Sequence, residues 1–110
     1  MRHYEIILMI SPDKEHDINN VLEACFLIVN KYSGVVYRLE YWGCRKLSYP
    51  IKKFYQAYYV LMNVEIAQTA LDEIRKIFIF DDVVIRSMII RVRCAVTKIS
   101  PIMQENEKIL

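Results

Sequence analysis

The order of its regular segments constrains the fold of this chain more than any other feature. Four stretches rich in β-branched and aromatic residues alternate with two stretches whose apolar residues recur at helical spacing. In chain order we expect a strand over 4–10, a helix from Ser11 to about residue 32, strands over 35–42 and 58–65, a helix over 67–78 and a strand over 83–92. This order, β-α-β-β-α-β, is the split β-α-β or ferredoxin-like pattern. It predicts an α+β fold in which a four-stranded, antiparallel-type sheet carries two helices on one face.

The ends of these elements carry local signals. Ser11-Pro12-Asp13 is typical of a helix start, and Ser33-Gly34 is typical of a helix end at which Gly34 takes the left-handed conformation. The segment 43–56 contains Tyr49-Pro50 and is expected to be irregular and basic. We expect the first and third strands to form the central pair of the sheet and to run parallel.

The chain of 110 residues has the size of a single domain, and its 55% of hydrophobic residues is enough for a core. We expect one domain over residues 1–98 and a loose, polar tail over 99–110. No run approaches the ~18 apolar residues of a membrane-spanning helix. The apolar run that follows Arg2 is better explained as a first strand than as a signal peptide. We therefore expect no membrane association.

The predicted sheet has apolar side chains on both of its faces. If Tyr4, Ile6, Leu8 and Ile10 of the first strand face the helices, alternation places Ile7 and Met9 on the opposite face. The third and fourth strands also carry apolar residues on both faces. Because two helices cover only one face, an apolar patch of several hundred Å² would remain, and such a patch usually marks an interaction surface. The alternative is that long side chains and the C-terminal tail cover it.

Cations gather in the middle of the chain, with aromatic residues between them. Between residues 38 and 53 only Glu40 opposes a set of five cations, namely Arg38, Arg45, Lys46, Lys52 and Lys53. A second set consists of Arg2 together with the last-strand residues Arg86, Arg91 and Arg93, which we expect along one shared edge. Cations neutralise phosphates and aromatic rings stack on unpaired bases, which favours RNA binding. Ordinary solvated charge explains the pattern alone slightly better, because the net charge is only +2.

Neither a catalytic nor a metal site is expected. Three cysteines without a Cys-x-x-Cys spacing indicate neither a disulfide framework nor a zinc site, and point to a reducing compartment. His3 and His16 have no carboxylate or cysteine at ligand spacing, and no serine has the glycines of a nucleophile elbow. Cys25 belongs to the apolar stripe of the first helix and is expected in the core.

The run Trp42-Gly43-Cys44-Arg45-Lys46-Leu47-Ser48-Tyr49-Pro50-Ile51-Lys52-Lys53 resembles a motif of the bacterial small-subunit ribosomal protein S6 family. Gly43, Arg45, Leu47, Tyr49, Pro50 and Ile51 match that motif. The opening Met1-Arg2-His3-Tyr4-Glu5, the stretch 59–65 and the stretch 84–88 are similar to the family as well, so that the resemblance spans residues 1 to about 98.

The resemblance implies a ferredoxin-like structural protein of the cytoplasmic ribosome, without enzymatic activity, cofactor or small-molecule substrate. Such proteins bind the central domain of 16S rRNA together with ribosomal protein S18. Because these cations cluster, we expect the rRNA contacts to include Arg2, Arg45, Lys46, Lys52, Lys53, Arg86 and Arg91. The register of the family also implies a face for the protein partner, which points away from the helices. The residues expected on this face are Ile7, Met9, Tyr59, Leu61, Met88 and Ile90. Many members end in a long acidic run, which this chain lacks, so tail modification is in doubt.

Other functions remain as alternatives. An RNA-recognition motif needs stacking aromatics on its central strands, and the third strand lacks the Lys/Arg-Gly start of that motif. An acylphosphatase-type enzyme needs a phosphate cradle after the first strand, where Asp13 and Glu15 would repel phosphate. A small-molecule regulatory module is the remaining possibility.

Overall fold

The structure, a computed structural model, describes residues 1–94. The elements follow one another as β1 (Arg2–Ile10), a short 3₁₀ helix η1 (Pro12–Asp17), α1 (Ile18–Lys31), β2 (Val35–Ile51), β3 (Phe54–Ile66), α2 (Gln68–Phe80) and β4 (Val84–Val92). The predicted β-α-β-β-α-β order is confirmed. The expected domain limit at residue 98 and the expected tail over 99–110 lie outside the described residues.

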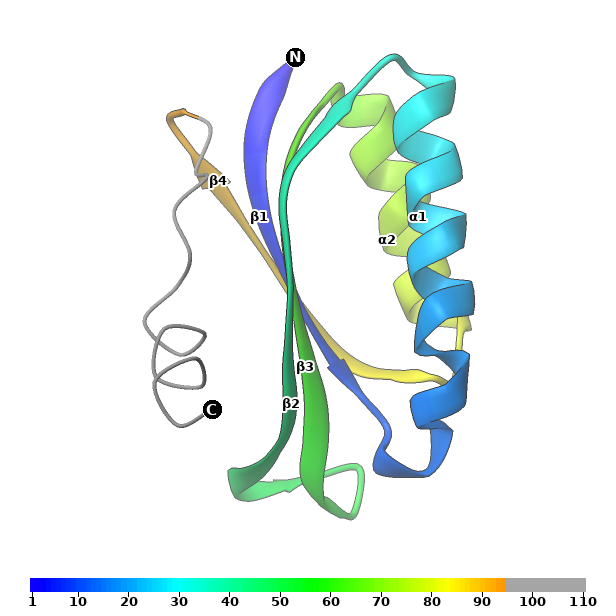
Figure 1. Cartoon of the computed structure of the whole chain (residues 1–110), viewed down its shortest axis with the longest axis vertical. Coiled ribbons are helices and arrows are strands. Elements are labelled where there is room, and N and C mark those ends of the chain that lie inside the picture. The colour runs from blue at the N-terminus through cyan, green and yellow to red at the C-terminus, as the bar shows by residue number, and fades with distance from the viewer. Residues whose placement is uncertain (95–110) are drawn as a thin grey trace, which may run out of the picture.

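The four strands form one sheet in the order β2-β3-β1-β4, and both helices cover the same face of it (Figure 1). Every neighbouring pair is antiparallel, including the central pair β1 and β3. The expectation of a parallel central pair is therefore wrong. The first helical crossover returns β2 in the direction of β1, and the β2–β3 hairpin then reverses the chain, so that β3 must run against β1.

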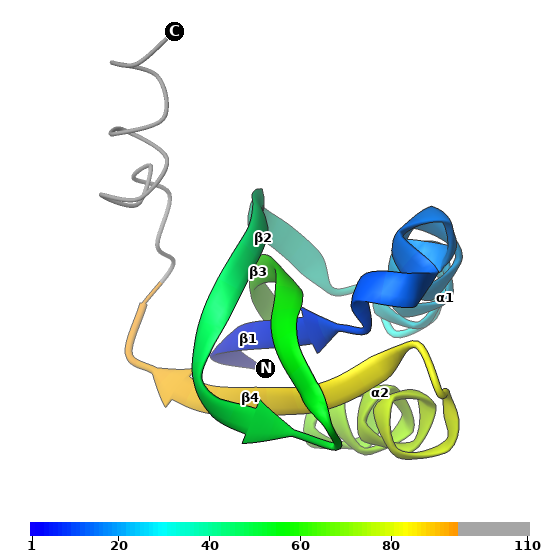
Figure 2. The same ribbon diagram turned by 90° about the horizontal axis from the view of Figure 1, so that it is seen from below.

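The β2–β3 hairpin is longer than the sequence predicted. The segment 43–56, expected to be irregular, is almost entirely strand: β2 continues to Ile51 and β3 begins at Phe54. Register shifts interrupt the pairing, and Gly43 has a φ of 81° beside one of them. Such bulges bend and twist a strand pair. The end of the hairpin accordingly curls from the β2 side of the sheet toward β4 (Figure 2).

The first helical region ends differently from the prediction. The left-handed residue after α1 is Ser33, with a φ of 59°, and not Gly34. The Gly34 N–H donates to the Val29 carbonyl at 2.8 Å, which terminates the helix. A glycine is needed at 34 for a different reason: a Cβ there would lie 2.7 Å from the Glu65 carbonyl oxygen and 2.7 Å from Ile66 Cγ2.

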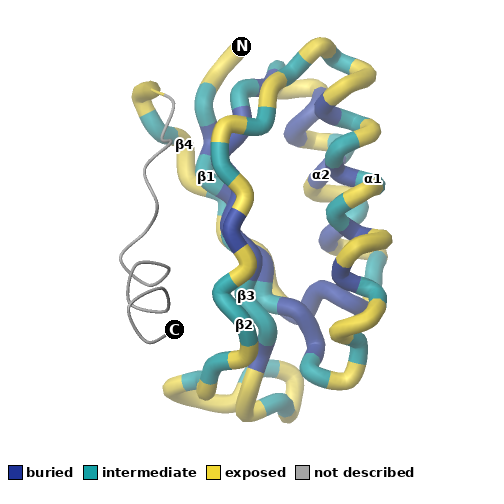
Figure 3. Tube along the Cα trace, in the orientation of Figure 1, coloured by how far each residue is buried: buried dark blue, intermediate teal, exposed yellow. Residues whose placement is uncertain are grey.

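The core lies between the helices and the sheet (Figure 3). Along β1, burial alternates from residue to residue, and the helix-facing side chains are almost fully buried: Tyr4, Ile6, Leu8 and Ile10. Cys25 is buried among them as predicted, and burial raises the pKa of its thiol to about 12. The helix-covered face is therefore a conventional apolar core, and the other face of the sheet carries no helix.

Candidate protein and RNA interfaces

The helix-free face carries all six residues that the family register places there. Ile7 of β1 lies between Leu61 of β3 and Met88 of β4, and Met9 lies between Tyr59 and Arg86. Ile90 of β4 is paired with Glu5. Directly paired residues project from the same side of a sheet. The apolar side chains of three strands thus form one continuous surface opposite the helices.

This surface is not uniformly open. Met88 is 40% exposed and Ile90 is 45% exposed, whereas Leu61 is only 1% exposed. Leu61 was expected to be uncovered, and its burial corrects that expectation. It occupies the central strand β3, flanked by Ile7 on one side and by Glu40 on the other. The accessible apolar area consequently lies on the β4 side of the face.

A charged network that the sequence analysis missed occupies the middle of the helix-free face. Arg38 of β2 donates from Nε to Asn63 Oδ1 at 2.8 Å and from Nη2 to Glu5 Oε1 at 3.1 Å. Glu40 Oε2 lies 4.0 Å from Arg38 Nη1. The Trp42 Nε1–H donates to Glu40 Oε1 at 2.9 Å. The signal was present in the sequence, because Arg38 and Glu40 are two residues apart on one strand and Glu5 shares the parity of Ile7.

The curled end of the hairpin covers the part of the helix-free face around Met9, Tyr59 and Arg86. A hollow of about 350 Å³ lies between the hairpin and the sheet, and is lined by Met9, Leu47, Ser48, Tyr49, Ile51, Tyr59, Arg86 and Met88. Arg86 Nη1 donates a hydrogen bond to the Tyr49 hydroxyl at 2.8 Å, which joins the hairpin to β4. Segments separated by 37 residues are therefore held together at this end of the sheet.

The hairpin turn itself has an unusual conformation. Ile51 pairs with Phe54, so that the loop between the strands consists of Lys52 and Lys53 alone. Their φ angles are 49° and 72°. Two consecutive positive φ angles are the mark of a type I′ turn, which prefers Asn-Gly. The left-handed region costs an ordinary residue about 1–2 kcal/mol, so this turn is strained.

The predicted RNA contacts separate into two groups at opposite ends of the sheet. The hairpin group consists of Arg45, Lys46, Lys52, Lys53 and Arg86. The far group consists of Arg2 and Arg91, which lie near one another because Arg91 pairs with Tyr4. Arg86 is opposite Met9, five residues along β1 from Tyr4, or roughly 17 Å away. The expected single edge shared by Arg2 and all of the last-strand arginines is thus wrong for Arg86.

Several aromatic residues near the cations already have partners within the chain. Trp42 stacks on Tyr59, with ring centroids 6.2 Å apart, and Tyr41 stacks on Tyr58 at 6.1 Å. Tyr49, at 59% exposed, and Tyr55, at 71% exposed, remain accessible to another molecule.

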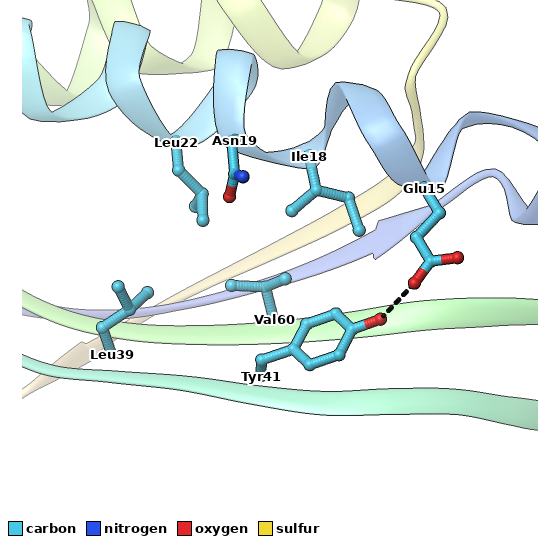
Figure 4. Close-up of a pocket in the computed structure, with 7 residues that line it drawn as sticks. All are labelled: Glu15, Ile18, Asn19, Leu22, Leu39, Tyr41 and Val60. Atoms are coloured by element: carbon cyan, nitrogen blue, oxygen red, sulfur yellow. Dashed lines mark hydrogen bonds between the residues drawn. The ribbon is translucent and has the colours of Figure 1, made fainter.

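A groove of about 360 Å³ runs between the start of α1 and strand β2 (Figure 4). Its walls include Leu22, Leu39 and Tyr41, and Glu15 lies at one end. The hydroxyls of Tyr41 and Tyr58 donate to the two Glu15 carboxylate oxygens at 3.4 Å and 3.0 Å. Burial, reinforced by Glu15, raises the pKa of Tyr41 to about 12, and the hydrogen bond to Glu15 is the main cause that raises the pKa of Tyr58. Both phenols therefore stay protonated at neutral pH and donate hydrogen bonds to the Glu15 carboxylate.

Within residues 1–94, no group of three or more His, Cys, Asp or Glu side chains is arranged to hold a metal ion. None of the helices described is long and apolar enough to cross a membrane.

The strand order and the two helices on one face define a small α+β protein of the ferredoxin-like class. The family model described as Ribosomal protein S6 matches residues 3–91, and the chain belongs to this family of structural, non-enzymatic proteins of the small ribosomal subunit. The chain is similar in structure to the 30S ribosomal protein S6 from Thermotoga maritima, whose crystal structure matches it with a TM-score of 0.74 and 24% sequence identity. The match covers 97% of this chain and 94% of the Thermotoga maritima chain. That likeness confirms the fold.

Proposed function

We propose that this chain binds the central domain of 16S rRNA together with ribosomal protein S18. The helix-free face takes the protein partner, and the basic end of the β2–β3 hairpin takes the RNA. The proposal rests above all on one observation: no Asp or Glu occurs from residue 41 to residue 64, a stretch that includes the whole hairpin end and four of its cations.

The protein partner is assigned to the helix-free face because apolar area is accessible there. Met88 and Ile90 are 40% and 45% exposed and lie beside Ile7 and Met9. Burying one such side chain fully is worth about 1.5–3 kcal/mol, so a few of them can anchor a complex. The charged network of Arg38, Glu5 and Glu40 borders this area and would fix the orientation of the partner.

RNA is assigned to the hairpin end because its cations are unopposed there. Lys46, Lys52 and Lys53 are exposed, and Arg45 is half-buried. Phosphate contacts depend on such charges and weaken with salt. The exposed rings of Tyr49 and Tyr55 lie among them and offer surfaces for stacking on an unpaired base.

The experiment measures binding to a central-domain fragment of 16S rRNA, with and without S18, over a range of salt concentrations. The charge-reversed variant Arg45→Glu/Lys46→Glu is expected to weaken assembly in the presence of S18 and to lower the log–log salt slope by about two. A thermal melt of the variant confirms that it is folded.

Arg2→Gln/Arg91→Gln serves as the comparison, since it removes two cations from the far end of the sheet. A slope that falls only in this second variant would move the RNA contact to the far group. An unchanged affinity and slope in the hairpin variant would show that the hairpin cations are bystanders.

A further inference from the structure

The Lys52-Lys53 turn combines two features that seldom occur together. It is the tightest possible connection between β2 and β3, because Ile51 and Phe54 are paired directly. Both of its residues have positive φ angles, 49° and 72°, although neither is glycine, asparagine or aspartate. Residues held in sparsely populated backbone regions occur preferentially at binding and catalytic sites, where a function compensates for the strain.

No interaction with the described part of the chain compensates for this strain. Lys52 and Lys53 are both exposed, and neither ammonium group has a hydrogen-bond or ion-pair partner among residues 1–94. Glycine or asparagine would adopt the same backbone with less strain. The lysines therefore contribute nothing visible to the stability of the hairpin.

The charge of the turn is also unopposed. Arg45 and Lys46 lie further back on β2 of the same hairpin, opposite Ala57 and Gln56. The nearest acids in sequence are Glu40 and Glu65, and Glu40 is buried within the network of Arg38 and Trp42. Like charges without a counterion favour the binding of a polyanion, whose approach relieves their repulsion.

We propose that the Lys52-Lys53 turn is a contact site for successive phosphates of an RNA backbone, retained at the expense of hairpin stability. This inference rests on the proposed RNA-binding function. An ammonium group acts on phosphate as a point charge, and phosphates carry no base sequence. The turn thus positions the RNA without reading its sequence. The backbone strain arises because lysines occupy two positions with positive φ that glycine or asparagine would adopt more easily.

The test separates charge from strain with two variants of the full chain, each measured with S18 and a central-domain fragment of 16S rRNA. Lys52→Asn/Lys53→Gly removes both charges and relieves the strain, whereas Lys52→Gln/Lys53→Gln removes the charges and keeps a side chain at both positions. The Asn-Gly variant is expected to melt at least about 4 °C above the wild type. The Gln-Gln variant is expected to melt close to the wild type.

Both variants are expected to lower the salt slope by about two and to weaken RNA binding by about one to two orders of magnitude near 0.1 M salt. The loss should be equal for an RNA of the same length and shuffled sequence. Arg75→Gln/Lys76→Gln is the matched control, because it removes two consecutive exposed cations from α2, on the helix side of the protein. This control should bind RNA like the wild type.

If both variants keep the wild-type slope while the wild type binds, the turn is no phosphate site, although the proposed function stands. If the Asn-Gly variant melts no higher than the Gln-Gln variant, the strain argument is wrong and the inference falls. If the wild type itself fails to bind the fragment with S18, the proposed function fails, and the inference fails with it.

Discussion

The Arg38 guanidinium of β2 lies 3.1 Å from the Glu5 carboxylate of β1, and the pair spans the intervening strand β3 on the helix-free face. The side chain of Arg38 is 10% exposed and that of Glu5 is 26% exposed. Three strands are thereby joined by side chains where no helix packs on the sheet. The network explains how the centre of this face is ordered although the core lies on the other side.

Replacing Arg38 with methionine should destabilise the protein. The variant keeps a long apolar stem but leaves Glu5 and Asn63 without their charged donor, which should lower the free energy of unfolding by on the order of 2 kcal/mol. Urea denaturation measures this change. Arg91→Met, at an exposed position of β4, is the control and should have a much smaller effect. Equal midpoints for the two variants would show that the network adds no stability.

Ile90→Glu and Leu61→Glu should have opposite consequences, although both lie on the helix-free face. Ile90 is 45% exposed, so a carboxylate there remains hydrated and the melting temperature should change little. Leu61 is 1% exposed, so the same substitution buries a charge and should unfold the protein. If this face binds S18, Ile90→Glu should weaken that complex by tenfold or more, or at least ~1.4 kcal/mol. Thermal melts test the two stability expectations, and partner titration tests the effect on the complex. A Leu61→Glu protein that still folds would contradict the expected unfolding.

The contact between the two helices should make stability depend on acid pH. The Tyr32 hydroxyl donates to Glu73 Oε1 at 2.6 Å, and this bond, with help from Lys31, holds the pKa of Glu73 below its ordinary value. Because the folded-state pKa is lowered, the stabilisation is present above the ordinary pKa and is lost as the pH falls through the folded-state value. Tyr32→Phe should therefore lose stability at pH ~7 and differ less from the wild type at pH ~3. Urea midpoints at both pH values measure the difference, and a constant gap between the two proteins would refute the linkage.

The two glycines should respond differently to alanine. At Gly34 a Cβ would lie 2.7 Å from both the Glu65 carbonyl oxygen and Ile66 Cγ2, so Gly34→Ala forces the β2 entry away from β3 and should cost about 1–3 kcal/mol. At Gly43 a Cβ meets nothing within 4 Å, and only its φ of 81° opposes the substitution. Gly43→Ala should cost about 1–2 kcal/mol. A crystal structure of each variant would show displaced backbone at residue 34 and unchanged packing at residue 43.

The order of the elements and the division of β1 into two alternating faces were determined by the sequence alone. Tyr4, Ile6, Leu8 and Ile10 alternate with a period of two, and the structure buries all four of them against the helices. The helical stripe through Cys25 was equally readable. Such patterns are local: the period of the apolar residues decides which residues share one side of an element, whatever its neighbours are. The family motif around Gly43 to Ile51 was also visible in the residues themselves.

Tertiary structure decided what lies next to these elements. The pairing of Arg38 with Glu5 depends on the register of two strands that each pair with β3, and the bulges near Tyr37 and Trp42 set that register for β2. The strand character of 43–56 was hidden because Tyr49-Pro50 signals a break, yet pairing with β3 on one side maintains the strand up to Lys46 and resumes at Ile51. The curl of the hairpin then brings Tyr49 to Arg86. The antiparallel register of β4 on β1 places Arg86 beside Met9 and therefore far from Arg2. Contacts of this kind depend on bends and registers summed over many residues, and no local period in the sequence encodes them.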